Sequence, residues 1–245
     1  MTGHHAGPRS NADGTTAASS EVDGTVETES IERALDALTA GEPVLVHDAA
    51  DREGETDLIY HADAVTPDAV ARLRNDAGGL VCTALGHDVA EAFDLPFYTE
   101  AVDHPAAGGH DLGYDERSSF SLTVNHRDTY TGITDIDRAL TITALGRSSS
   151  DPDAASFADE FRSPGHVHLL RAAPNLLADR KGHTELGLAL AKEAGRAPAV
   201  VVCEMLDDDS GRSLSKQDAR RYARRHSLPY LDGETIVRDL QTPNP

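Results

Sequence analysis

The spacing of apolar residues alternates between helical and strand periods after the first 28 residues. Ile31, Ala34 and Leu38 lie on one face of a helix, flanked by a serine that can cap its start and a glycine that can end it. An apolar run over residues 43–46 follows and predicts a buried strand. The same spacing predicts helices beginning near Thr66, Thr134, Thr184 and Ser215, and strands over 80–85, 120–125, 167–171, 199–205 and 230–231. This order favours one α/β or α+β domain over residues 29–245.

The segment before this domain has a different composition. Residues 1–28 are mostly Gly, Ser, Thr, Ala, Asp and Glu. Ordering such a segment costs backbone entropy that the burial of so few apolar side chains cannot offset. We therefore expect residues 1–28 to form a disordered N-terminal tail.

The chain is strongly acidic. Its 245 residues contain 42 Asp and Glu but only 22 Lys and Arg, which gives a formal net charge of −20. This charge opposes binding to nucleic acids and to anionic membranes, because both are negative. Such a charge is typical of proteins in a cytoplasm of very high salt, where mobile ions screen the repulsion among carboxylates. We therefore expect a halophilic protein.

Cysteine use and the lack of long apolar segments favour a cytoplasmic protein. Cys82 and Cys203 lie inside apolar runs, so we expect small buried side chains rather than a disulfide framework. No stretch approaches the roughly 18 consecutive apolar residues of a membrane span, and the start of the chain lacks the pattern of a secretion signal.

Carboxylates are concentrated directly after the strand predicted at residues 43–46. Five of the ten residues from 48 to 57 are acidic, and one is an arginine. These carboxylates repel one another unless a cation or a cationic ligand lies between them. Loops at strand ends commonly carry binding sites, so the segment predicts a cation site. A solvated acidic turn explains this segment alone equally well.

A basic segment precedes the helix predicted near Thr184. Residues 180–185 read Arg-Lys-Gly-His-Thr-Glu. Two cations, a glycine that allows close backbone approach, and free N–H groups at a helix N-terminus suit an anion of the size of phosphate. An ordinary capped helix with basic neighbours is the alternative interpretation.

Two further residues are candidates for proton transfer. Glu204 ends an apolar strand, and burial of an unpaired carboxylate is costly, so Glu204 should emerge from the core or have a partner. A carboxylate there can act as a general acid or base, or can simply mark the end of the core. His166 follows a Pro-Gly turn and is either a proton shuttle or an ordinary turn residue.

Several motifs occur in an order that is specific to one family. They are 51–58 (Asp-Arg-Glu-Gly-Glu-Thr-Asp-Leu), Thr66-Pro67, 78–82 (Gly-Gly-Leu-Val-Cys), 131–134 (Thr-Gly-Ile-Thr), 137–139 (Asp-Arg-Ala), 162–166 (Arg-Ser-Pro-Gly-His), 180–185 and 203–205 (Cys-Glu-Met). Together they resemble the 3,4-dihydroxy-2-butanone 4-phosphate synthase family over residues 30–237, with an acidic motif similar to that of its archaeal branch. Ala50, at a position that is often acidic in relatives, and the polar tail depart from the pattern.

The resemblance implies three groups of site residues. The metal ligands, for magnesium or manganese, are Glu53 and His183. The catalytic residues, which serve proton transfer, are His166, Glu204, Glu55 and Asp48. The substrate-binding residues, which hold the phosphate and the sugar hydroxyls, are Arg52, Glu53, Asp57, Cys82, Thr131, Arg180, Lys181, Gly182, His183, Thr184 and Glu204.

The resemblance also implies a fold and a reaction. The fold is α+β, a single compact domain with a mixed β-sheet core covered by helices. The family converts D-ribulose 5-phosphate to L-3,4-dihydroxy-2-butanone 4-phosphate and formate in riboflavin biosynthesis. The implied mechanism is metal-stabilised enediolate formation, skeletal rearrangement and loss of C4, at sites between the subunits of a homodimer.

Two other functions remain compatible with the same segments. One is a different magnesium-dependent sugar-phosphate isomerase or aldolase, and the other is a non-catalytic module that binds phosphate or metal. Release of formate from ribulose 5-phosphate separates the first function from both of these.

The net charge of −20 predicts that salt stabilises the fold. Repulsion among like charges reaches about 30 Å at 0.01 M salt but only about 3 Å at 1 M. We expect the melting temperature and the activity to rise together from low salt to molar potassium chloride. Thermal melts across a potassium chloride series measure this effect. A melting temperature that stays flat or falls contradicts the halophilic interpretation and leaves the enzymatic one standing.

Overall fold

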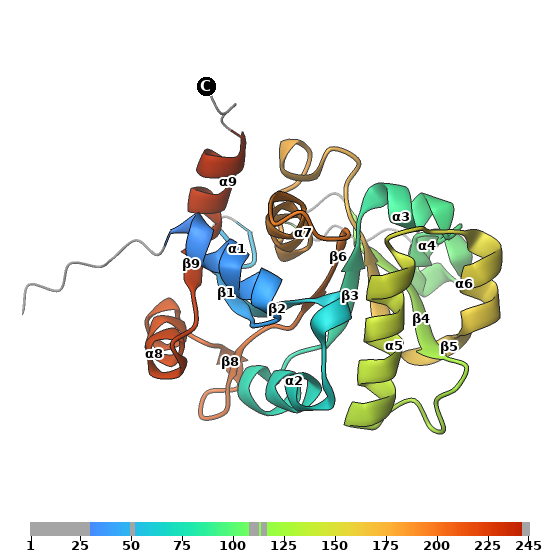
Figure 1. The fold of residues 1–245 in the computed structure, drawn as a ribbon, viewed down its shortest axis with the longest axis horizontal. Helices are drawn as coiled ribbons and strands as arrows, with labels where there is room; N and C mark the ends of the chain where they lie inside the picture. The colour runs from blue at the N-terminus through green and yellow to red at the C-terminus, as the bar shows by residue number, and fades with distance from the viewer. Residues whose placement is uncertain (1–29, 50–51, 108–112, 114–116, 242–245) are drawn as a thin grey trace, which may run out of the picture.

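A seven-stranded mixed β-sheet lies at the centre of the fold (Figure 1). The computed structural model describes residues 30–49, 52–107, 113 and 117–241, so the predicted tail at 1–28 lies outside the described residues. The strands follow the order β4-β5-β3-β6-β2-β1-β9. Their bounds are β1 (Val44–His47), β2 (Thr56–His61), β3 (Cys82–Leu85), β4 (Phe120–His126), β5 (Phe161–Arg171), β6 (Ala199–Val202) and β9 (Tyr230–Asp232). A separate two-stranded hairpin consists of β7 (Leu206–Asp207) and β8 (Arg212–Ser213).

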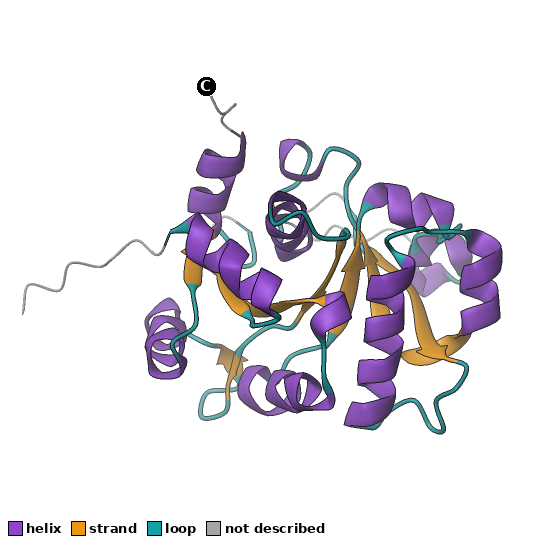
Figure 2. Ribbon diagram, viewed as in Figure 1, coloured by secondary structure: helices purple, strands orange, loops and turns teal. Residues whose placement is uncertain are grey.

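Helices cover both faces of this sheet (Figure 2). The α-helices are α1 (Ile31–Ala40), α2 (Pro67–Arg72), α3 (His87–Ala92), α4 (Tyr98–Ala101), α5 (Asp135–Ser148), α6 (Ala154–Glu160), α7 (His183–Glu193), α8 (Lys216–His226) and α9 (Gly233–Gln241). Short helical turns are η1 (Ala62–Ala64), η2 (Leu73–Ala77), η3 (Pro105–Ala107) and η4 (Leu176–Ala178). None of the helices within the described ranges is long and apolar enough to cross a membrane.

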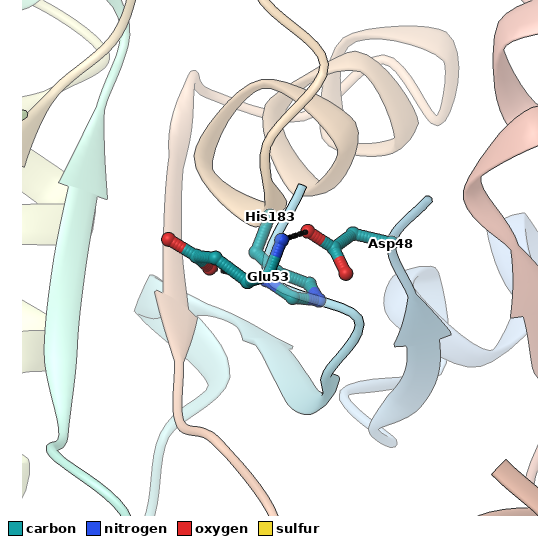
Figure 3. A group of neighbouring side chains, drawn as sticks. All are labelled: Asp48, Glu53 and His183. Carbon is teal, nitrogen blue, oxygen red and sulfur yellow. Dashed lines mark hydrogen bonds and ion pairs between the residues drawn. The ribbon is translucent and has the colours of Figure 1, made fainter. Parts of the chain in front are cut away.

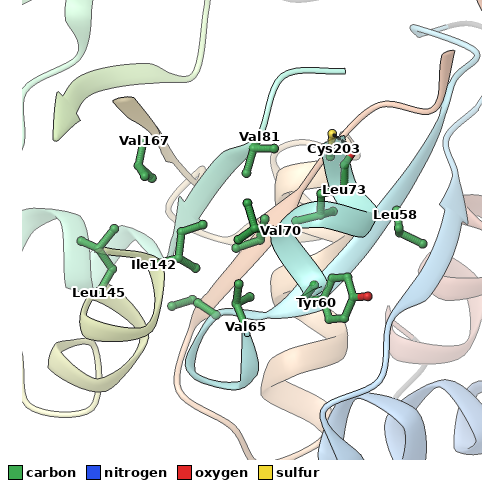
Figure 4. Packing of buried hydrophobic residues seen from close by; sticks show 14 of the residues in the cluster. Leu58, Tyr60, Val65, Val70, Leu73, Val81, Ile142, Leu145, Val167 and Cys203 are labelled. Atoms are coloured by element: carbon green, nitrogen blue, oxygen red, sulfur yellow. Dashed lines mark hydrogen bonds between the residues drawn. The ribbon is translucent and has the colours of Figure 1, made fainter. Parts of the chain in front are cut away.

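The sheet separates two hydrophobic cores because successive side chains of a strand point to opposite faces. One core joins α1, α7 and α9 to the sheet, with Leu38, Leu186 and Ile236 among its buried side chains. On the opposite face, helices α2 and α5 contribute Val70 and Ile142 (Figure 4). The expected architecture is therefore confirmed: a mixed sheet enclosed by helices in one domain.

Helices with complete local signals begin and end as the sequence predicts. Ser30 accepts a hydrogen bond from the N–H of Arg33 at the start of α1, and Gly41 ends that helix with a φ of 81°. Thr66 caps α2 in the same way, with Pro67 in its first turn. Thr134 accepts from the N–H of Asp137 at the start of α5.

Apolar residues at 120, 122 and 124 alternate with polar residues at 121, 123 and 125, and strand β4 departs from the burial that this alternation predicts. Its pairing with β5 shifts register between Phe120 and Thr123 and again between Val124 and Asn125. Each irregularity changes the face on which the next residues lie. Ser121 and Asn125 are buried, although the alternation predicts that they face outward, and Phe120, which precedes both shifts, is exposed.

Strand β2 was not predicted. It is buried along its whole length, between β1 and β6, so its residues do not alternate between apolar and polar. Thr56, Asp57 and His61 are buried polar residues within it. Their presence made this segment read as part of the acidic loop.

Candidate metal and anion site

Three segments from distant parts of the chain meet at one end of the sheet. They are the loop between β1 and β2, the N-terminus of α7, and the residues that follow β6. Asp57 at the start of β2 forms a β-bridge with Glu204, and the N–H of Leu58 donates to the carbonyl oxygen of Cys203 at 2.9 Å. The acidic segment, the basic segment and Glu204 are therefore brought together, as the proposed chemistry requires.

Asp48 shapes the acidic loop. Its side chain is buried, and its two carboxylate oxygens accept hydrogen bonds from the N–H groups of Glu53 at 3.2 Å and Glu55 at 3.0 Å. The carboxylate therefore folds the loop back on itself and fixes the backbone from which Glu53 projects. Asp51 lies outside the described residues.

Asp48, Glu53 and His183 form a compact group of possible metal ligands (Figure 3). One ligand atom from each lies within 4.8 Å of the others. The His183 Nδ1 atom is 3.6 Å from Glu53 Oε2 and 3.5 Å from Asp57 Oδ1. Within the described residues, the buried atoms Asp57 Oδ1 and His183 Nε2 have no hydrogen-bond partner. Carboxylate oxygens beside an imidazole suit a divalent cation, so these residues fit the metal that the resemblance implies.

The charges in this group are strongly coupled. Burial raises the pKa of Asp57, and the neighbouring carboxylates of Glu204, Glu53 and Glu55 raise it further, against the opposing effect of His183. Burial lowers the pKa of His183, but the surrounding carboxylates outweigh it and raise that pKa overall. The group therefore attracts positive charge, which a proton on His183 or a bound cation can supply.

The N-terminus of α7 forms the opposite, basic end of the site. Arg180 Nη1 lies 3.0 Å from Glu185 Oε2, and Glu185 is completely buried in the first turn of the helix. A Cβ atom at Gly182 would be 3.1 Å from Arg52 Nη2 and 3.2 Å from Arg180 Nη1. Two guanidinium groups thus converge on a helix N-terminus, where the first N–H groups are not used within the helix. This arrangement favours an anionic ligand.

Glu204 is held by the backbone that leads into β3. Its carbonyl oxygen accepts from the N–H of Gly79 at 3.0 Å, and its Oε2 atom accepts from the N–H of Leu80 at 2.8 Å. A Cβ atom at Gly79 would overlap Oε2 and would lie 2.5 Å from the carbonyl oxygen of Glu204. Only glycine therefore permits this approach, which fixes the direction of the Glu204 carboxylate.

The two ends meet in a cavity of about 180 Å³. The predicted site residues that line it are Glu53, Asp57, Cys82, Arg180, Gly182, His183, Thr184 and Glu204. The walls that sequence analysis missed come from Ser118, Ser119, Phe120, Leu170 and Val202. The serines carry no spacing pattern that would have revealed them. Burial raises the pKa of the Cys82 thiol, so Cys82 contributes a neutral side chain to the wall.

Three predicted residues lie apart from this cavity in the described part of the chain. Lys181 is exposed beside the cavity-lining Arg180 and Gly182. Thr131 is exposed on the loop before α5, and His166 is exposed on β5. The remaining three, Asp48, Arg52 and Glu55, belong to the acidic loop: Arg52 Nε is 4.0 Å from Asp48 Oδ2, and Glu55 accepts a hydrogen bond from Ser213 Oγ.

Comparison with known proteins gives close relatives of this chain. A 3,4-dihydroxy-2-butanone 4-phosphate synthase of Methanosarcina mazei is 49% identical over 85% of this chain and 90% of its own length. Its namesake from Archaeoglobus fulgidus is 49% identical over 84% and 92%. Among solved structures, the Candida albicans enzyme is 31% identical with a TM-score of 0.72, over 86% of this chain and 97% of that one. A synthase in complex with two magnesium ions is also 31% identical, with a TM-score of 0.74, over 86% and 96%.

The geometry suits a class of protein in which an anionic small molecule lies between a cation-attracting group of carboxylates and a helix N-terminus. The family model for 3,4-dihydroxy-2-butanone 4-phosphate synthase matches residues 32–239. The chain belongs to this family, which confirms the resemblance drawn from its motifs. It is therefore a lyase of riboflavin biosynthesis.

The close approach of Gly79 to Glu204 predicts a sharp difference between neighbouring glycines. Gly79→Ala should displace the Glu204 carboxylate and lower formate release by about 100-fold, the scale of a 1 Å misplacement. Gly78→Ala is the matched control, because its φ of 86° strains an alanine while the added Cβ meets only Leu206 Cβ at 3.9 Å. The control should therefore melt earlier but retain turnover. Equal turnover in both variants would show that Gly79 does not position Glu204.

Proposed function

We propose that this chain is a magnesium-dependent 3,4-dihydroxy-2-butanone 4-phosphate synthase that acts as a homodimer in a salt-rich cytoplasm. Residues 29–245 would be its catalytic domain, and manganese could replace magnesium. The observation that supports the proposal most directly is the shared cavity, which Glu53 and His183 line together with Arg180 and Thr184. A ketose phosphate has the matching form, with oxygen ligands at one end and a phosphate at the other.

Different residues of the cavity would bind the phosphate and the cation. Arg180 and Thr184 would hold the phosphate, with Gly182 leaving room for it and Lys181 adding positive charge from the surface. Glu53 and His183 would hold the divalent cation. Asp48 would support Glu53, because its carboxylate accepts a hydrogen bond from the backbone N–H of Glu53. When bound, the cation would polarise the carbonyl and hydroxyl oxygens of the sugar.

Carboxylates beside Glu53 and His183, the two residues that would hold the cation, would contact the sugar and transfer its protons. Asp57 and Glu204 line the same cavity, and the bridge between their backbones keeps the two side chains adjacent. Because its pKa is raised by burial, Asp57 can hold a proton near neutral pH, which suits a hydrogen bond to a sugar hydroxyl. Arg52 would contact the sugar, and Glu55 would act beside it from the acidic loop. Cys82 would contribute only its apolar surface.

Exposed apolar side chains in the segment 130–140 support the homodimer. They are Tyr130, Ile133, Ile136 and Leu140, which are 94, 51, 70 and 39% exposed, respectively. Exposed apolar residues concentrated in one segment favour a surface that another protein covers. Thr131 lies within the same segment, so a second copy that covers it would receive Thr131 and His166 at its own site. Two of the three residues that lie apart from the cavity would thereby complete the site of the other subunit.

The metal assignment is tested by two variants and one control. Glu53→Gln and His183→Ala should each abolish magnesium-dependent formate release from ribulose 5-phosphate, and should lose the rise in melting temperature that magnesium gives the unaltered protein. Asp208→Asn removes the same charge as Glu53→Gln from an exposed hairpin and should keep both properties. If the unaltered protein releases formate but magnesium does not raise its melting temperature, the metal role is refuted. If the unaltered protein releases no formate, the reaction is refuted.

The interface assignment predicts complementation between inactive subunits. His166→Ala and His183→Ala proteins should each be inactive, because each damages both sites of a homodimer. Co-expressed in equal amounts, they should regain about a quarter of normal activity, since half of the dimers carry one intact site. If the mixture stays inactive while it is folded and dimeric, both residues act within one subunit.

A further inference from the structure

Asn125 connects His166 to the loop of Thr131, two of the three predicted site residues that lie apart from the cavity. It is buried on β4, where its backbone pairs with Arg162 of β5 and its side chain contacts His166 of the same strand. A Cβ atom at Gly132, the residue after Thr131, would overlap the Asn125 side-chain amide. Asp137 holds this loop in place by accepting from the N–H groups of Thr131 and Gly132. One amide side chain therefore lies against both the Thr131 loop and His166.

The hydrogen bonds of Asn125 determine its orientation. The backbone N–H of His166 donates to Asn125 Oδ1 at 2.8 Å, so the oxygen of the amide must face that N–H. The amide nitrogen then faces the imidazole, with Asn125 Nδ2 3.1 Å from His166 Nδ1. Because an amide NH₂ group can only donate, His166 Nδ1 must accept. A proton on Nδ1 would face the N–H of Asn125, donor against donor.

The geometry points to a His166 ring that is oriented by Asn125 and that, in its neutral form, carries its proton on Nε2. Such a histidine can donate a hydrogen bond from Nε2, but it cannot accept a proton there. In the reaction it would polarise an oxygen of the sugar, as neutral histidines do in other enzymes of phosphorylated sugars. Asn125 is thus a positioning residue, and this inference about its effect on turnover rests on the proposed function.

Backbone packing makes this orientation rigid. A Cβ atom at Gly165 would overlap the backbone of Val124, so β5 lies as close to β4 as a glycine allows. The N–H of Gly165 also donates to Thr123 Oγ1 at 3.2 Å. The backbone of β5 is therefore held directly before His166, and among the hydrogen bonds of the described residues the amide of Asn125 faces the Nδ1 atom of the ring.

Nitrogen NMR of the imidazole tests the tautomer without any need for activity. The His166 ring, assigned by its absence in His166→Gln, should show an unprotonated Nδ1 and a protonated Nε2. In Asn125→Asp, the carboxylate keeps the bond from the His166 N–H but turns its second oxygen toward the ring, so the proton should move to Nδ1. A protonated Nδ1 in the unaltered neutral ring would overturn the inference.

Kinetics test the positioning role. Asn125→Asp should lower kcat by about 100-fold while KM changes little, because the change affects the proton held at the reacting atoms. Asn75→Asp is the matched control, since it makes the same amide-to-carboxylate change at an exposed residue of η2 and should leave both the tautomer and kcat unchanged. A normal kcat in Asn125→Asp would overturn the positioning role. If the unaltered protein releases no formate, the proposed function fails, and the NMR result still decides the tautomer.

Discussion

Buried negative charge beside His183 is the constraint on which the rest of the structure depends. Asp48 and Asp57 are 2 and 1% exposed, and Glu53 lies next to both. Burial of uncompensated carboxylates costs several kcal/mol each, roughly, so positive charge must lie close to them. The N-terminus of α7 supplies part of it through the helix dipole and His183. Helix α7 must therefore begin where β1 ends and β2 starts, which places β6 and Glu204 at the same end of the sheet.

The same constraint explains why the cavity carries unequal charges at its two ends. The charge of Arg180 is offset by Glu185, a carboxylate that also accepts from the N–H of Ala173 at 3.0 Å. Around His183, Arg52 lies 4.0 Å from Asp48, but the carboxylates of Asp48, Glu53 and Asp57 all act on the imidazole, and the raised pKa of His183 expresses that excess of negative charge. A cation bound there lowers the repulsion, and an anion at α7 then lies close to it. We therefore expect that a cation bound at the carboxylates and an anion bound at the N-terminus of α7 strengthen each other's binding.

Local signals decided what the sequence could predict. The helix starts at Ser30, Thr66 and Thr134 were predictable, because a cap and a first-turn pattern are read within a few residues. The motif residues of the cavity were predictable from family resemblance, since the loop and the helix start keep their order. Strand β2, buried on both faces, gave no alternation. The exposure of Ile136 was equally hidden, because burial depends on what lies opposite the helix in space.

Long-range pairing decided the rest, and His166 shows why. From sequence it follows a Pro-Gly turn, but in the fold it lies inside β5, and its ring faces a residue 41 positions earlier. That pairing, and not the turn, determines which of its nitrogens carries the proton. It also keeps His166 beside Thr131 on a surface apart from the cavity. In the proposed homodimer, a site divided between two surfaces of one chain would be complete only when two chains meet, and each carries a net charge of −20. Screening by salt would therefore act twice, on the folding of each chain and on the assembly that joins the two parts of the proposed site.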